Sequence, residues 1–212
     1  MKKSRTVYHL IVDRSGSMMD CIDETINGFN EQVNQIKRNV EAYPDEEIVM
    51  GLTVFNDNVD HLLTNAAPST VNSLTREVYR PSGSTALLDA IGLTIKELEY
   101  GISAINNPLP TKNLVIILTD GYENCSKIYN LDLIRSLILK LEKSGNWTFS
   151  FIGATLDAVD VAQSLNIKKQ NSLCFQKSEM NEKVWNRLHL SMDKYFSKKQ
   201  KGQNTDNLFE EE

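Results

Sequence analysis

The sequence predicts an α/β fold with a doubly wound, mostly parallel sheet of six strands, one antiparallel edge strand and helices on both faces. Apolar runs alternate along the chain with amphipathic helical patterns, and this alternation is typical of parallel sheets. Residues 114–119 are almost continuously apolar and branched, as expected of a strand covered on both faces. Residues 48–55 and 59–63 are separated only by Asn56-Asp57-Asn58, which predicts a hairpin and therefore the antiparallel edge.

Each remaining element follows from the spacing of apolar residues. Steps of three and four predict long helices, and short apolar runs bounded by turn residues predict strands. Tyr43-Pro44-Asp45 ends the first helix, Asn106-Asn107-Pro108-Leu109-Pro110 breaks the second, and Gly145 closes the third. Residues 64–84 are expected to be mainly loop, with a short helix near 69–74. The expected helices are 22–40, 87–102, 133–141, 157–165 and 180–196, and the expected strands are 7–13, 48–55, 59–63, 114–119, 147–152 and 172–175.

The length and composition indicate one large domain. The chain has 212 residues, of which 41% are hydrophobic, enough to build a sizeable core. We assign residues 1–196 to a single domain. Residues 197–212 are mostly polar and charged, so we expect them to form a disordered tail.

Several classes of protein are disfavoured by composition. The net charge of −5 argues against binding to a nucleic-acid backbone, which needs a basic face. The longest apolar runs are far shorter than the roughly 20 residues of a membrane-spanning helix. The first apolar run is short and leads directly into a polar motif, so we interpret it as a strand rather than a signal peptide. Three sparse cysteines predict free thiols, and therefore a cytoplasmic protein.

The most informative motif is Asp13-Arg14-Ser15-Gly16-Ser17, which comes directly after the first predicted strand. It carries one carboxylate and two hydroxyls at alternate positions, in a turn that Gly16 makes flexible. Hard oxygen ligands of this kind suit Mg²⁺ or Mn²⁺ and suit soft metals poorly. In open parallel sheets, ligands gather beyond the carboxyl ends of the strands, where this motif is expected to lie.

Two further segments complete a family resemblance. Together with the first motif, residues 81–91 (Pro-Ser-Gly-Ser-Thr-Ala-Leu-Leu-Asp-Ala-Ile) and 118–121 (Leu-Thr-Asp-Gly) resemble the three loops of the metal-ion-dependent adhesion site in von Willebrand factor type A (vWA) domains. The resemblance implies a Rossmann-like fold. Within the family, the motifs look most similar to those of bacterial stand-alone members, including the tellurite-resistance-associated type. The ligand set that it implies is Asp13, Ser15, Ser17, Thr85 and Asp120.

The resemblance implies a binding function rather than catalysis. In the family the hydroxyls bind the metal directly and the aspartates act largely through water, which leaves a coordination position for an Asp or Glu side chain of another protein. We therefore expect a metal-dependent protein-binding module, with no catalytic residue, no nucleic-acid partner and no membrane contact. The alternative is a metal-dependent phosphoryl-transfer or hydrolytic enzyme. It is disfavoured because Ser15 stands where an Asp-x-Asp phosphatase has its second acid, and no Gly-x-Ser-x-Gly motif is present.

Several of these polar residues can also be explained by structural roles that do not involve a metal. Taken singly, each Ser or Thr of the set can be explained as a helix cap or a turn residue, and only the set as a whole favours a metal. Asp89 is equally consistent with a helix surface or with bracing of a loop. Ser84 either faces the metal or bonds to backbone. The three histidines have no partner at ligand spacing, so we interpret them as structural.

Overall fold

The computed structural model describes residues 2–103, 109–154 and 158–209. Its six strands form one sheet in the order β3-β2-β1-β4-β5-β6, in which β2–β3 is the antiparallel pair and the other pairs are parallel. The strands are β1 (Ser4–Asp13), β2 (Glu46–Phe55), β3 (Val59–Ala66), β4 (Thr111–Thr119), β5 (Trp147–Gly153) and β6 (Ser172–Cys174). The α-helices are α1 (Ile22–Ala42), α2 (Leu87–Ser103), α3 (Leu131–Lys143), α4 (Ala158–Ser164) and α5 (Asn186–Gln200).

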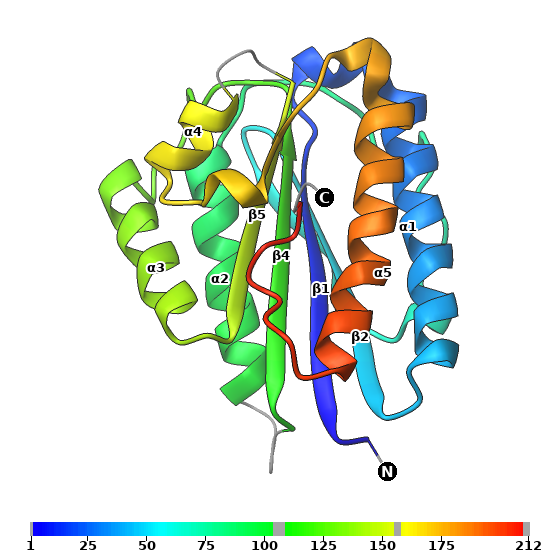
Figure 1. Cartoon of the computed structure of the whole chain (residues 1–212). Coiled ribbons are helices and arrows are strands. Elements are labelled where there is room, and N and C mark those ends of the chain that lie inside the picture. The colour runs from blue at the N-terminus through cyan, green and yellow to red at the C-terminus, as the bar shows by residue number, and fades with distance from the viewer. Residues whose placement is uncertain (1, 104–108, 155–157, 210–212) are drawn as a thin grey trace.

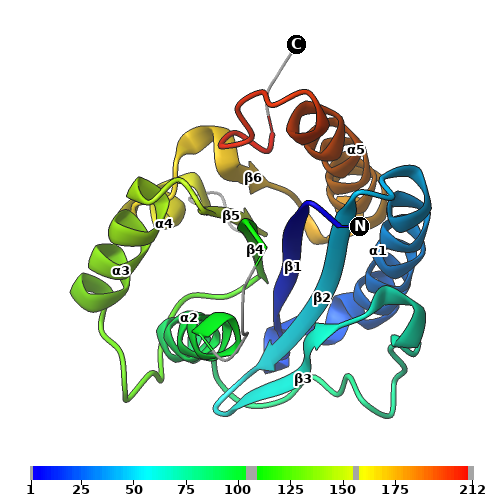
Figure 2. The ribbon, with the colours of Figure 1, turned by 90° about the horizontal axis from the view of Figure 1, so that it is seen from below.

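The helices cover both faces of the sheet, as Figures 1 and 2 show. Helices α1 and α5 lie on one face, and α2, α3 and α4 lie on the other. Side chains of β1 alternate between the two layers: Tyr8 and Leu10 belong to the core under α1 and α5, whereas Val7 and Ile11 belong to the core under α2. The predicted fold class is therefore confirmed. Within the described residues, no helix is long and apolar enough to cross a membrane.

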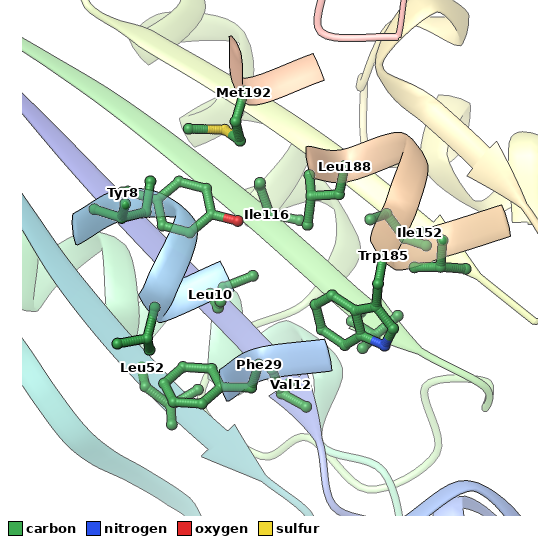
Figure 3. Close-up of a cluster of buried hydrophobic side chains, with 14 of the residues drawn as sticks. Tyr8, Leu10, Val12, Phe29, Leu52, Ile116, Ile152, Trp185, Leu188 and Met192 are labelled. Carbon is green, nitrogen blue, oxygen red and sulfur yellow. The ribbon is translucent and has the colours of Figure 1, made fainter. Parts of the chain in front are cut away.

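The core under α1 and α5 depends on a close approach between two segments that are distant in sequence. Figure 3 shows Trp185, which precedes α5, lying over the sheet close to Phe29 of α1. The indole packs against Gly28 so closely that a Cβ at that position would lie 2.0 Å from a ring atom. A side chain at residue 28 is therefore excluded while Trp185 keeps its place.

The short elements differ from the prediction in detail. Near 69–74 the structure has only a 3₁₀ turn, η2 (Pro68–Thr70). The closing helix begins as a π-helical turn, η5 (Met180–Trp185), before α5. Val184 and Trp185 of this turn are both buried in the core. The predicted break at 106–108 and the helix start at Asp157 lie outside the described residues.

The prediction of a disordered tail from residue 197 is wrong for the described part of that segment. Helix α5 continues to Gln200, and Lys199 donates a 2.6 Å hydrogen bond to Thr6 Oγ1 and forms an ion pair with Glu46. Beyond the helix, Leu208 and Phe209 are buried in the same core as α1 and α5. The composition is polar, but these few residues find partners on the sheet, so the segment is ordered by specific contacts. Residues 210–212 lie outside the described residues.

The backbone of the final segment is also bonded to the domain. The amide of Phe209 donates to the carbonyl of Gln170 at 3.0 Å, and the amide of Leu208 donates to Asn171 Oδ1 at 2.7 Å. In return, Asn171 Nδ2 donates to the carbonyl of Asp206 at 2.8 Å. These partners belong to the 3₁₀ turn η3 (Lys169–Asn171), which leads into the edge strand β6. The segment after α5 thus closes the core beside β6 (Figures 1 and 2).

Candidate metal site

The predicted site residues lie at the carboxyl edge of the two central strands. Asp13 is the last residue of β1, and Asp120 directly follows β4, the parallel neighbour of β1. The chain winds from β1 outward through β2 to β3, and from β4 outward through β5 to β6. The site is therefore at the switch point of the doubly wound sheet, where the loops diverge and leave a crevice.

Asp13 is fully buried and tightly held. Its Oδ1 accepts a 2.6 Å hydrogen bond from the Ser15 amide, and its Oδ2 accepts one of 2.6 Å from Thr119 Oγ1. Tyr79 donates from its hydroxyl to the Asp13 carbonyl at 2.5 Å. Burial raises the pKa of the Asp13 carboxyl to about 6, the hydrogen bonds from Thr119 and Ser15 oppose this shift, and the negative charge of Asp120 adds to it.

The two serines of the first loop link Asp13 to Asp120. Ser15 Oγ lies 3.1 Å from Ser17 Oγ, and Ser17 Oγ donates a 2.6 Å hydrogen bond to Asp120 Oδ1. The loop turns at Gly16, where the 3₁₀ helix η1 (Gly16–Cys21) begins. The Gly16 amide donates to the carbonyl of Gly83 at 3.0 Å, which joins the first loop to the second.

Thr85 completes the convergence from the second loop. Its amide donates to Asn124 Oδ1 at 2.9 Å, and its carbonyl accepts from the Asn124 amide at 3.1 Å. A Cβ built on Gly121 would lie 3.1 Å from Thr85 Oγ1, 3.6 Å from Ser17 Oγ and 3.7 Å from Asp13 Oδ2. Oxygens from the first and second loops therefore lie around one point beside Gly121 of the third loop, and the glycine leaves that point open.

The donor set fits a hard divalent cation. It consists of two carboxylates and three hydroxyls, and oxygen-only sites of this kind suit Mg²⁺ or Mn²⁺. Within the described residues there is no group of three or more His, Cys, Asp or Glu side chains that could hold a metal. A cation here would therefore depend on the hydroxyls as well as on Asp13 and Asp120. Burial is the main cause of the raised pKa of Asp13, and repulsion from the Asp120 carboxylate makes a smaller contribution that a cation between the two groups would relieve.

A residue that the sequence pattern did not indicate also reaches the site. Lys177 Nζ lies 2.6 Å from Asp120 Oδ2 and donates a 2.6 Å hydrogen bond to the carbonyl of Ser17. It belongs to the 3₁₀ turn η4 (Lys177–Glu179), which follows β6 at the far edge of the sheet. No motif or spacing links this lysine to the metal loops, so only the tertiary structure brings it there. Thr119 and Tyr79, which position Asp13, also escaped the sequence analysis, although Thr119 directly precedes Asp120.

Asp89 has the loop-bracing role rather than a place among the converging oxygens. Its carboxylate accepts hydrogen bonds from the amides of Lys127, Ile128 and Tyr129 at 2.8–2.9 Å. Glu123 braces the same loop from the other side and accepts from the Leu88 amide at 2.8 Å. These contacts tie the loop after Asp120 to the start of α2, so they fix the relative positions of the second and third loops.

The other polar residues considered from sequence have structural surroundings. The Ser84 amide donates to Asp57 Oδ2 at 3.1 Å. His9 is buried, its Nε2 lies 2.8 Å from Thr53 Oγ1, and burial lowers its pKa to about 3. Cys21 is a buried free thiol whose pKa burial raises to about 11, so it is protonated at neutral pH.

The buried charge of Asp13 leads to a prediction about stability without metal. Because the folded-state pKa of Asp13 is raised from 3.8 to about 6, the contribution of this residue to stability is fully present at low pH and is lost as the pH rises through 6 and the carboxylate ionises. In the presence of a chelator, Asp13→Asn is therefore expected to be more stable than wild type at pH 7.5. The expected gain is about 1–3 kcal/mol, because a tenfold change in a protonation equilibrium corresponds to about 1.4 kcal/mol. The advantage should shrink as the pH falls toward 4. Urea unfolding of both proteins across this range measures it, and a difference that does not change with pH would contradict it.

Comparison with known proteins identifies the class to which this fold and site belong. A model of the von Willebrand factor type A domain family matches residues 9–188, which is most of the chain. The chain therefore belongs to the von Willebrand factor type A domain family. Members of this family are typically metal-dependent adhesion or protein-interaction modules and mostly not enzymes.

Solved structures with the same fold come from distant organisms. The vWF domain of the type V pili tip protein Mfa5 from Porphyromonas gingivalis is 10% identical, with a TM-score of 0.60 over 91% of this chain and 96% of that chain. Manganese-loaded TRAP protein from Plasmodium vivax is 19% identical, with a TM-score of 0.58 over 84% of this chain and 71% of that chain. Proximal thread matrix protein 1 from the mussel byssus is 16% identical, with a TM-score of 0.56 over 88% of this chain.

Chain coverage and sequence identity decide what these comparisons establish. This chain spans 45% of the mussel protein, less than half of its length. At identities of 10–19%, the likeness establishes the shared fold alone. A search of curated proteins found no match.

Proposed function

We propose that this chain is a protein-binding module that depends on a divalent metal. In this proposal Asp13, Ser15, Ser17, Thr85 and Asp120 form a complete metal-ion-dependent adhesion site for Mg²⁺ or Mn²⁺. The partner is another protein, and one of its Asp or Glu side chains completes the coordination of the metal. The observation that carries the proposal is the convergence of Asp13, Ser17 and Thr85 oxygens around the open point beside Gly121, with Ser17 also bonded to Asp120.

The charge of the donor set supports a binding role. Three of the five donor groups are neutral hydroxyls, so the two carboxylates offset the charge of a divalent cation and leave no excess negative charge, and the Lys177 ammonium adds a positive charge nearby. When bound, the metal supplies a strong electrostatic attraction for an external carboxylate. The chain's own residues would fix the direction of approach, because Asp13 and Thr85 are buried and held by backbone and side-chain hydrogen bonds. The manganese-loaded state of the similarly folded Plasmodium vivax protein is consistent with this proposal.

The same surroundings argue against a hydrolytic or phosphoryl-transfer enzyme. Both carboxylate oxygens of Asp13 accept hydrogen bonds, which lower their nucleophilicity, and residue 15 is a serine rather than the second acid of an Asp-x-Asp phosphatase. Ser15 and Ser17 contact each other and Asp120 rather than a histidine. His9 and His61 instead both contact Thr53. Among the residues that the structure describes, the site therefore has the parts of a binding centre and no pair of activated nucleophile and base.

We further propose that the protein acts in the cytoplasm and resembles the stand-alone bacterial members of the family, including the tellurite-resistance-associated type. The motif Asp13-Arg14-Ser15-Gly16-Ser17 and the loop 81–91 support the subfamily. The three free cysteines support a reducing compartment. The net charge of −5 supports protein partners rather than nucleic acid.

Capture of partners from a host lysate tests this function. In a buffer that contains Mg²⁺ or Mn²⁺ at a concentration of about 1 mM, the immobilised wild-type protein should retain a partner that EDTA releases. Asp13→Ala should fail to retain it, because the buried carboxylate would be missing. Replacing the acidic residues of the recovered partner one at a time should then identify the carboxylate that binds.

A matched control keeps the test specific. Asp45→Ala removes an exposed aspartate before β2, at the opposite edge of the sheet, and should bind like wild type. If capture survives both EDTA and Asp13→Ala, the metal-dependent mechanism is wrong for this chain.

A further inference from the structure

The positive charge of Lys177 lies inside the donor set described above. Its Nζ is 2.6 Å from Asp120 Oδ2, 2.6 Å from the Ser17 carbonyl that accepts its hydrogen bond, and 3.8 Å from Asp20 Oδ2. The Asp120 side chain is fully buried, whereas the Lys177 side chain is 33% exposed. One oxygen of Asp120 thus faces Ser17 Oγ, and the other faces an ammonium group.

The main chain holds this lysine over the site between two buried anchors. Phe175 precedes it, is buried, and donates from its amide to the Gly153 carbonyl at 3.1 Å. Met180 follows η4 and is fully buried. Between them, Gln176 and Glu179 form a reciprocal capping arrangement that fixes the turn. The lysine therefore projects from a fixed support rather than from a loose loop.

Electrostatic repulsion opposes the presence of both an ammonium group and a divalent cation beside Asp120. Both carry positive charge, and both are attracted to the same buried carboxylate oxygen, so each weakens the binding of the other. Removal of the ammonium without replacement would leave Asp120 unpaired beside Asp13, which is also unfavourable. The buried Asp120 carboxylate is therefore stable only beside a positive charge, and the Lys177 ammonium provides that charge when no metal is bound.

We propose that Lys177 is an internal competitor of the metal and sets the Mg²⁺ or Mn²⁺ concentration at which the site fills. This rests on the metal-binding function proposed above. When a metal binds at Asp120, the ammonium moves outward to Asp20, whose side chain is 83% exposed and already 3.8 Å away. The lysine thus lowers the metal affinity of the site and keeps the fold intact when the metal is absent.

Titration of the free protein with Mn²⁺ tests this competition. Free Mn²⁺ is measured by electron paramagnetic resonance for wild type, Lys177→Met and Lys177→Gln. Both variants remove the ammonium, so they should bind Mn²⁺ more tightly by about tenfold, the scale of losing one charge-assisted contact of 1.4 kcal/mol. In EDTA both should melt at a lower temperature than wild type, because Asp120 is left unpaired. Lys127→Met removes an exposed lysine from the loop after Asp120 and controls for the general loss of one positive charge.

The outcomes separate this inference from the function on which it rests. Tighter binding by both Lys177 variants but not by Lys127→Met supports the competition, including the case in which wild type binds no measurable Mn²⁺. If wild type binds Mn²⁺ and the Lys177 variants bind equally or more weakly, the competition is wrong while the metal site stands. If neither wild type nor any variant binds Mn²⁺, both the competition and the metal-binding function are wrong.

Discussion

Phe209→Ala is expected to lower the free energy of unfolding by about 3–5 kcal/mol, the range for deleting a buried aromatic side chain. Phe209 is only 4% exposed and belongs to the core cluster that contains α1 and α5. Its loss would leave a cavity beside the edge strand β6 and would weaken the contacts of the final segment with Asn171 and Gln170. Urea unfolding followed by circular dichroism measures the effect.

Deletion of residues 201–212 should destabilise the protein at least as much, because it removes Leu208 together with Phe209. Gln203→Ala is the matched control. Gln203 is exposed, and its one described hydrogen bond, from the main-chain amide to the Lys198 carbonyl, survives the substitution, so a change within about 0.5 kcal/mol is expected. A similarly small change on deletion of the segment would show that its packing contributes nothing in solution.

Saturating Mn²⁺ is expected to raise the free energy of unfolding by about 2.7 kcal/mol at 100 times the dissociation constant, provided that the unfolded chain does not bind the metal. The stabilisation arises because the donor oxygens come from three loops and converge only in the folded state. Asp13→Ala should abolish the shift. Ser17→Ala and Thr85→Ala should weaken it, because each removes one neutral hydroxyl and leaves both carboxylates in place.

Thermal unfolding with Mn²⁺ and with EDTA measures this stabilisation for each variant. Asp45→Ala serves as the control, since it removes an exposed carboxylate on the opposite edge of the sheet and should respond like wild type. An unchanged response in Asp13→Ala would place the stabilising metal elsewhere in the protein. It would also remove the basis for the proposed adhesion site.

The Asp13 carboxylate is expected to lower stability without metal and to be required for stabilisation with metal, so the site can be tested in both conditions. Without metal, the buried carboxylate opposes folding above pH 6, so Asp13→Asn is expected to stabilise. With metal, the same carboxylate should be required for stabilisation, so its removal should cost the metal response. A residue that served only as a turn former would not reverse its effect when Mn²⁺ is added.

The fold class and the positions of most elements could be predicted from the amino-acid sequence. Periodicity and burial are local properties: apolar steps of three and four specify α1, α2 and α3, and branched runs specify β1, β2, β4 and β5. The motif at Asp13 and the segments around Thr85 and Asp120 were visible for the same reason, since each lies within a few residues of a strand end or helix start. The rule that parallel strands present their carboxyl ends at one edge then placed the three loops together.

The meeting of distant side chains, by contrast, became apparent only in the folded molecule. Lys177 reaches Asp120, Thr119 and Tyr79 hold Asp13, and Phe209 enters the core, although none of these pairings has a periodic or spacing signal. The final segment looked too polar to fold because composition averages over residues, whereas order depends on individual contacts such as those of Lys199 with Thr6 and Glu46. Local sequence specifies where elements begin and end, but the partner of a buried charge or of a single aromatic ring is set by how the packed layers bring remote segments together.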